Sequence, residues 1–148
     1  MARVLLIRHA ANDYTQAGKL AGWKAGVSLN KSGREEAALL AEQLAGAPIE
    51  AVYSSPLARA LQTARPIAVA RHLQVVRCAR LGEVRYGDWQ GKSLKSLRRR
   101  KLWRLIQQRP SAAKFPGGES IRAVQVRAVA AMEELVARHP NDCIAVVS

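Results

Sequence analysis

Three short segments of the chain place an imidazole, two guanidinium groups and a carboxyl group where they suit the chemistry of phosphoryl transfer. Arg8 and His9 directly follow the apolar run 4–7. Arg59 lies a few residues beyond a second apolar run, and Glu83 lies in a loop beyond a third. Guanidinium forks match phosphate oxygens in bidentate fashion, so Arg8 and Arg59 are candidate phosphate ligands.

The other two side chains supply a nucleophile and an acid. A neutral imidazole attacks phosphorus effectively near pH 7, which makes His9 the candidate nucleophile. A leaving alkoxide needs a proton, and a positioned carboxyl group typically contributes about 10²- to 10⁴-fold by supplying it. Glu83 is the candidate proton donor. No metal is required if arginine and histidine provide the positive charge, and the sequence has no clustered carboxylates of the kind that hold Mg²⁺.

The elements that position these residues are predicted from hydrophobic pattern. Short apolar runs without polar alternation suit strands buried on both faces, and longer stretches of helical character separate them. This alternation predicts an α/β domain with a largely parallel sheet, in which ligands bind beyond the carboxyl ends of the strands. The four predicted strands are Ala2–Ile7, Ile49–Tyr53, Gln74–Cys78 and Cys143–Val147.

Four helices are predicted between the strands. Ser32 and Glu35 form a capping box that opens a helix over Gly33–Ala45. A second helix is expected to start near Ser55-Pro56, with a structural cap from the serines, and Pro66 is expected to kink or split it. The remaining two helices are expected over Leu94–Gln107 and Glu119–His139.

Size and composition indicate one compact domain spanning residues 1–148. Hydrophobic residues make up 49% of the chain and charged residues 24%, which is typical of a globular protein. The apolar runs are far shorter than a membrane span, and the N-terminus has no secretory pattern, so we expect a cytoplasmic protein with no membrane partner. Cys78 and Cys143 are expected to be reduced packing residues.

The net charge of +13 predicts that the protein attracts anions. The basic run Arg98–Lys101, followed by Trp103, is a possible nucleic-acid contact. Because the run continues an amphipathic helical pattern, a solvated helix face is the better interpretation. We therefore expect a small phosphorylated ligand rather than a nucleic acid.

An ordered set of motifs, spread over nearly the whole chain, resembles the histidine phosphatase superfamily, also called phosphoglycerate-mutase-like. Each motif is short, but together they keep the order and the spacing of that family. The motifs are Arg8-His9, Gly22-Trp23, Leu29-Asn30 with Gly33, Ser54-Ser55-Pro56-Leu57 with Arg59-Ala60 and Gln62-Thr63-Ala64, Glu83 with Tyr86-Gly87, Trp89 with Gly91, and Phe115-Pro116-Gly117-Gly118-Glu119-Ser120.

The resemblance implies a three-layer α/β/α sandwich around a mostly parallel sheet, with a phosphohistidine intermediate on His9. It also implies that Arg8 and Arg59 bind the phosphate, that Glu83 is the proton donor, and that no cofactor takes part. Asn12, Thr15 and Gly22 fall in the stretch that lines the family's phosphate pocket, so the resemblance adds them as candidate substrate-binding residues.

Two features depart from the family pattern. The family usually has glycine after the first histidine, whereas this chain has Ala10, followed by Ala11 and Asn12. The family also places a second catalytic histidine directly after a strand like Cys143–Val147 and its serine, and the sequence stops at Ser148. We therefore expect that a C-terminal part is missing and that the 148-residue chain is impaired in activity.

Three functions remain open at this stage. The first is a metal-independent phosphatase that transfers the phosphoryl group to water. The second is a phosphoglycerate-mutase-like phosphomutase, although the modest gap between Glu83 and Phe115 favours hydrolysis. The third is a non-catalytic protein that binds a phosphorylated ligand or nucleic acid. The sequence leaves the oligomeric state open, a homodimer included.

Overall fold

A sheet of four parallel strands lies at the centre of the protein, in a computed structural model that describes all 148 residues. The strand order is β1-β4-β2-β3, and every neighbouring pair is parallel. All four predicted strands are present within a residue of their expected bounds. They are β1 (Arg3–Ile7), β2 (Ile49–Ser54), β3 (Val75–Arg77) and β4 (Cys143–Val147).

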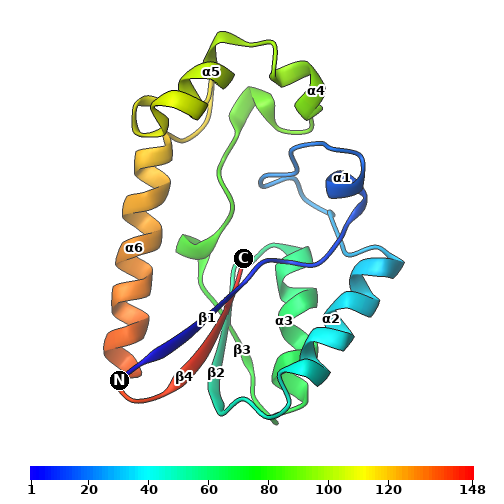
Figure 1. The fold of residues 1–148 in the computed structure, drawn as a ribbon, viewed down its shortest axis with the longest axis vertical. Coiled ribbons are helices and arrows are strands. Elements are labelled where there is room, and N and C mark those ends of the chain that lie inside the picture. Colours follow the sequence, from blue (N-terminus) through cyan, green and yellow to red (C-terminus); the bar gives the residue numbers. More distant parts are fainter.

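Helices cover both faces of this sheet and form three layers (Figure 1). Helices α2 (Lys31–Gln43) and α3 (Ala58–Val69) pack on one face, and α6 (Ile121–Arg138) packs on the other. Alternate side chains of a strand point to opposite faces. In β4, Ala145 accordingly joins the core under α3, while Ile144 joins the core under α6. The expected α/β/α sandwich is confirmed.

Helices α2 and α3 begin at other residues than predicted, and neither has the predicted serine cap. Helix α2 begins at Lys31, where the side chain of Asn30 accepts a hydrogen bond from the Gly33 amide at 2.9 Å. Asparagine caps as well as serine, and this earlier cap displaces the expected box at Ser32. Helix α3 begins at Ala58 and has no side-chain cap, so the expected serine cap is wrong.

Pro66 neither ends nor splits α3, which runs without interruption to Val69. The ring of a proline removes one backbone hydrogen bond from a helix. Here the surrounding residues are held by burial, since Ala64 and Ile67 are fully buried in the core beneath the helix. Tertiary packing therefore maintains a helix that local propensity alone would interrupt.

The predicted helix Leu94–Gln107 is two helices, α4 (Leu94–Leu97) and α5 (Lys101–Gln108). Arg100 between them is extended, with φ −81° and ψ 144°. The break lets Leu97 and the apolar side of α5 pack on one cluster with Trp89 and Phe115, which one straight helix would not allow. Figure 1 shows α4 and α5 at one end of the molecule, beyond the carboxyl ends of the strands; we call them the lid.

Short elements complete the chain. The helix α1 (Asp13–Gln16) follows β1, and single turns of 3₁₀ helix occur at Ala79–Leu81, Gly87–Trp89 and Pro110–Ala112. None of the helices has both the length and the apolar character needed to cross a membrane.

Candidate phosphoryl-transfer site

The ends of β1 and β2 and the loop after β3 meet at one cavity of about 170 Å³. Parallel strands bring their carboxyl ends to the same edge of a sheet, so residues far apart in sequence converge there. Five of the seven candidate residues line this cavity: Arg8, His9, Thr15, Arg59 and Glu83.

His9 is held so that one ring nitrogen is free. Its Nδ1 lies 2.9 Å from the carbonyl oxygen of Ala10, which can only accept a hydrogen bond. Nδ1 must therefore carry the proton, and in the neutral ring Nε2 keeps its lone pair. Burial lowers the pKa of His9 below its usual value of 6.5, and the charges of Arg59 and Arg8 lower it further. The neutral, nucleophilic form is favoured near pH 7.

Arg59 is buried beside His9 with hydrogen-bond donors to spare. Only 1% of its surface is exposed. Its Nη2 donates to the carbonyl oxygen of Gly22 at 2.9 Å, while Nε and Nη1 have no partner. Burial lowers the pKa of Arg59, but the guanidinium remains charged near neutral pH. A buried cation with free donors at a cavity wall is suited to bind an anion.

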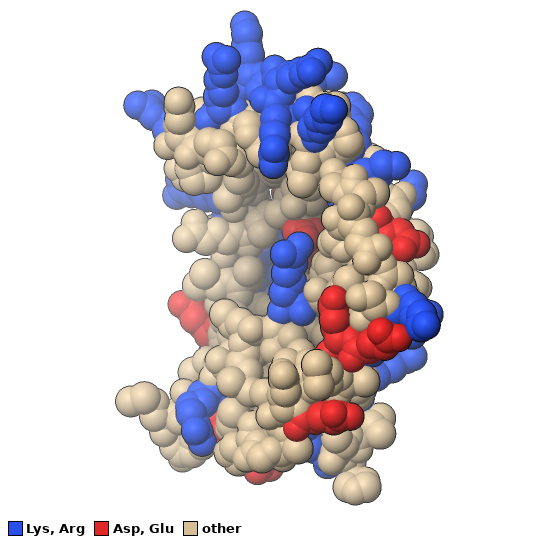
Figure 2. All heavy atoms as spheres, turned by 45° about the vertical axis from the view of Figure 1, so that its right-hand side comes forward, with Lys and Arg blue, Asp and Glu red and all other residues tan.

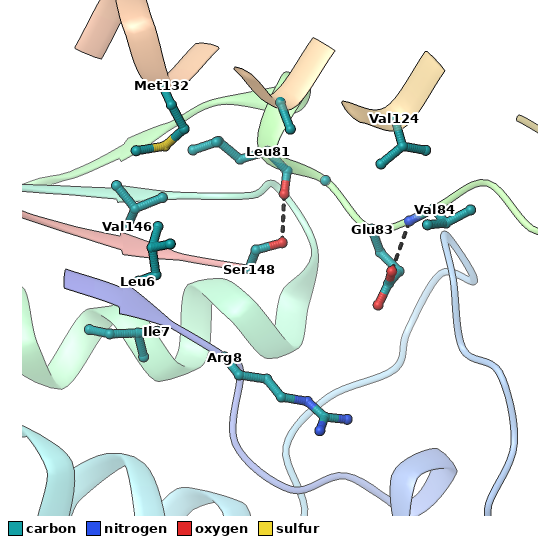
Figure 3. Close-up of a pocket in the computed structure, with 12 residues that line it drawn as sticks. Leu6, Ile7, Arg8, Leu81, Glu83, Val84, Val124, Met132, Val146 and Ser148 are labelled. Atoms are coloured by element: carbon teal, nitrogen blue, oxygen red, sulfur yellow. Dashed lines mark hydrogen bonds between the residues drawn. The ribbon is translucent and has the colours of Figure 1, made fainter. Parts of the chain in front are cut away.

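Glu83 reaches into the same cavity from the loop after β3. Figure 3 shows the side chains of Glu83 and Arg8, which come from different segments of the chain. Its Oε1 accepts hydrogen bonds from the Val84 amide at 2.9 Å and from the Tyr86 hydroxyl at 3.4 Å. Burial, with the nearby charge of Glu83, raises the pKa of Tyr86. Tyr86 therefore stays protonated and continues to donate, leaving Oε2 of Glu83 for a ligand.

The backbone of the Glu83 loop is fixed by Arg127 on α6. Arg127 makes a two-point ion pair with Glu119 at 2.9 Å and donates to the carbonyl oxygens of Arg80, Gly82 and Glu83. The hydrogen bonds from Arg127 lower the pKa of Glu119. Sequence reasoning missed Arg127, because an arginine within a long amphipathic helix has no local feature that distinguishes it from a surface residue.

Thr63 holds the segment that follows His9. Its hydroxyl oxygen accepts from the Ala10 amide at 3.0 Å and donates to the Arg59 carbonyl at 2.8 Å. Thr63 belongs to a motif quoted above, but no role was predicted for it. Ala10 contacts Thr63 through its amide and His9 through its carbonyl oxygen. Both contacts are made by the backbone, so they do not depend on whether this residue is alanine or glycine.

Asn12 and Gly22 do not line the cavity, and the structure gives each a supporting position. Asn12 is fully buried, and its side chain caps α1 by accepting from the Thr15 amide at 3.0 Å. Gly22 has φ +50°, and an added Cβ would lie 2.9 Å from the ring of Tyr86. Direct contact of either residue with a substrate stays a prediction.

An apolar groove of about 560 Å³ continues from the cavity along the α6 side of the sheet. In Figure 3, Leu6, Ile7 and Val146 line it from the strands, Val124 and Met132 face them from α6, and Arg8 and Glu83 stand at one end. Ser148 also lines the groove; its hydroxyl donates to the Leu81 carbonyl at 2.6 Å, and its backbone is hydrogen-bonded to both Ile7 and His9.

Several cationic side chains lie at the site. Lys19 joins Arg8 and Arg59 at the cavity, and no three His, Cys, Asp or Glu side chains are grouped so as to hold a metal ion. The lid adds exposed cations, which Figure 2 shows gathered at that end of the molecule. These exposed cations lie on α4 and α5 and on the residues next to them, and we call them the lid cations: Lys92, Lys95, Arg98, Arg99, Arg100, Lys101, Arg104 and Arg109.

Comparison with known proteins shows the family and the fold of this chain. The family model "Histidine phosphatase superfamily (branch 1)" matches residues 4–148. Phosphoserine phosphatase 1 of Hydrogenobacter thermophilus is 33% identical over 150 residues, which cover 100% of this chain and 71% of that protein. Phosphoglycerate mutase 1 of Saccharomyces cerevisiae is 36% identical over 98 residues, covering 62% of this chain and 39% of the mutase.

Among solved structures, the phosphoserine phosphatase of Entamoeba histolytica, crystallised with 3-phosphoglyceric acid, superposes with a TM-score of 0.90 at 27% identity. The match covers 100% of this chain and 74% of that one. The fold and the convergent histidine, arginines and glutamate define a phosphoglycerate-mutase-like α/β protein. The chain belongs to the histidine phosphatase superfamily, branch 1.

Proposed function

We propose that the protein hydrolyses phosphate monoesters in two steps through a phosphohistidine on His9. Nε2 of His9 attacks phosphorus, the bond from phosphorus to the ester oxygen breaks, and Glu83 gives its proton to the departing alkoxide. Water then attacks the phosphohistidine, Glu83 takes up the water proton, and inorganic phosphate leaves. The observation that carries the proposal is the Nδ1 contact with Ala10, which leaves Nε2 as the free lone pair.

Arg8 and Arg59 bind the non-reacting phosphoryl oxygens in this proposal. Their positive charges offset the negative charge of the incoming dianion, which otherwise hinders the approach of the nucleophile. The unpaired Nε and Nη1 of buried Arg59 gain partners when a phosphate enters, so binding relieves a desolvation cost that the free protein carries. We assign Thr15 to the same pocket because it lines the cavity.

Hydrolysis is favoured over mutase activity. The phosphoserine phosphatases of Hydrogenobacter thermophilus and Entamoeba histolytica named above match the whole chain, whereas the matched region of the yeast mutase covers 62% of it. A non-catalytic role has less support, because the nucleophile, the acid and the phosphate ligands converge on one cavity. The proposed partner is a small phosphorylated substrate, the proposed reaction uses no cofactor, and a cytoplasmic location stays a prediction.

The test is phosphoryl labelling of the full chain with a ³²P-labelled phosphomonoester, quenched during turnover. Label on His9 that is lost in acid and retained in base supports the mechanism. His9→Asn removes the nucleophile and should abolish labelling, while His72→Asn and His139→Asn remove histidines that lie elsewhere and should not. Turnover without label on His9 contradicts the proposal. Release of inorganic phosphate, rather than an isomeric ester, separates phosphatase from mutase.

A further inference from the structure

A second hollow adjoins the phosphate cavity beneath the lid, and we call it the apolar annex. Its volume is about 270 Å³, and no charged side chain lines it. For comparison, an apolar cavity of about 150 Å³ holds a benzene molecule. The lining residues are Leu20, Val84, Tyr86, Trp89, Leu94, Trp103, Ile106, Phe115 and Ile121.

The annex shares a wall with the phosphate cavity. Leu20, Tyr86 and Leu94 line both spaces, so the two hollows are neighbours separated by single side chains. Around the annex, Trp89 and Phe115 are buried, whereas Trp103 and Ile106 remain partly exposed. Aromatic and aliphatic groups that stay partly exposed around a hollow are typical of a ligand pocket.

The proposed chemistry places the alcohol part of the substrate on this side. Glu83 protonates the ester oxygen, so that oxygen must lie beside the Glu83 carboxyl group. Tyr86, which donates to Oε1 of Glu83, also forms part of the shared wall. Whatever substituent the ester oxygen bears therefore begins next to Tyr86, at the entrance to the annex.

We propose that the annex binds an apolar, ring-sized group on the alcohol of a phosphomonoester, so that the substrate class is that of aryl-alkyl and similar hydrophobic phosphate esters. This inference rests on the proposed phosphatase function. It sets the protein apart from enzymes for charged esters such as phosphoserine, because the annex offers no charged partner to an ammonium or carboxylate group and would leave either desolvated.

The test compares the 2-phenylethyl and ethyl esters, whose leaving alcohols have similar basicity, so that a difference in turnover reflects binding of the ring and not the reactivity of the leaving group. 2-Phenylethyl phosphate should show kcat/KM at least about tenfold above ethyl phosphate and above O-phosphoserine, as expected for a filled apolar pocket. Equal values for the phenylethyl and ethyl esters, or a preference for phosphoserine, overturn the inference while leaving the phosphatase function intact.

Variants locate the effect. Ile106→Trp fills the annex and Ile106→Asn makes it polar; both should remove most of the phenylethyl preference and leave ethyl phosphate turnover unchanged. Leu6→Ser is the matched control, since Leu6 lines the other apolar groove and is 75% exposed. Loss of the preference in Leu6→Ser, with no effect at Ile106, places the ring in that groove and contradicts the inference.

A binding measurement separates this inference from the function on which it rests. 3-Phenylpropylphosphonate cannot be hydrolysed, and its ring should change the fluorescence of Trp103 in the annex. Trp89 also lines the annex, so the Trp103→Phe variant should reduce the fluorescence change rather than abolish it. A change that this variant reduces supports the inference even if no ester is turned over, in which case only the phosphatase proposal fails. We expect 3-phenylpropylphosphonate to bind at least about tenfold more tightly than ethylphosphonate. Equal affinity for the two compounds overturns the inference that the annex binds a ring.

Discussion

Nη2 of Arg127 donates to the carbonyl oxygen of Glu83 at 2.9 Å, which ties helix α6 to the loop that carries the proposed proton donor. The same guanidinium is oriented by Glu119. The carboxyl group of Glu83 is therefore placed by its backbone from one side and by Tyr86 from the other. Catalysis depends on such placement, because the acid must be within hydrogen-bond reach of the ester oxygen.

Replacing Arg127 should thus impair catalysis more than binding. Arg127→Ala is expected to lower kcat by about 100-fold, the size of effect that a misplacement of about 1 Å can produce, with little change in KM. Steady-state kinetics on an alkyl phosphate measure this. Arg122→Ala, at an exposed position of the same helix, is the control. A rise in KM with unchanged kcat would show that Arg127 does not position the acid.

The acidic limb of the pH profile should lie below pH 6.5. Burial and the charges of Arg59 and Arg8 lower the pKa of His9, so the imidazole stays neutral until the pH falls through that lowered value. Activity should therefore persist at pH 6.5 and fall at lower pH as Nε2 becomes protonated. The pH dependence of kcat/KM and an NMR titration of the His9 ring both measure it.

The variant Arg8→Gln tests the cause of the lowered His9 pKa, since it removes one of the charges that oppose protonation of His9. The NMR pKa of His9 should rise in this variant. A His9 pKa at or above 6.5 in the unaltered protein contradicts the assignment.

Tyr53 and His139 should contribute to stability rather than to catalysis. The Tyr53 hydroxyl and His139 Nε2 are 2.8 Å apart, and His139 Nδ1 lies 2.8 Å from an oxygen of Asp142, which joins β2 to the turn after α6. Tyr53→Phe should lower the free energy of unfolding by about 1 kcal/mol, the usual net value of one hydrogen bond. Urea denaturation measures it, with Tyr14→Phe on α1 as the control.

The lid cations should accelerate capture of anionic substrates. At low salt, the variant Arg99→Gln with Arg100→Gln should reduce kcat/KM several-fold without changing kcat, because steering by charge typically contributes about 10- to 1,000-fold. The difference should shrink as added salt shortens the screening length. Arg3→Gln with Arg65→Gln removes the same charge from exposed positions outside the lid. An equal loss of kcat/KM in the two double variants would mean that the net charge of the protein, and not the position of the lid cations, sets the rate of substrate capture.

Much of the fold could be predicted because its signals are local. Apolar runs without alternation identified all four strands, and Cys143–Val147 was predicted to the residue. Helix boundaries were less certain, because Asn30 competed with Ser32 as a cap and because the lid helix breaks at Arg100 to pack two apolar segments on one cluster. Such choices depend on contacts that local sequence does not contain.

The sequence by itself determined the strands, the order of the motifs, and the residues at strand ends that line the cavity, since the geometry of a parallel sheet brings those ends together. Tertiary structure alone decided which nitrogen of His9 is free, that Arg59 is buried with unpaired donors, and that Arg127 holds the Glu83 loop. It alone also formed the annex, because Leu20, Trp103 and Phe115 become neighbours only when the lid folds over the site. Orientation, burial and long-range contact are properties of the folded chain, and residue order does not encode them locally.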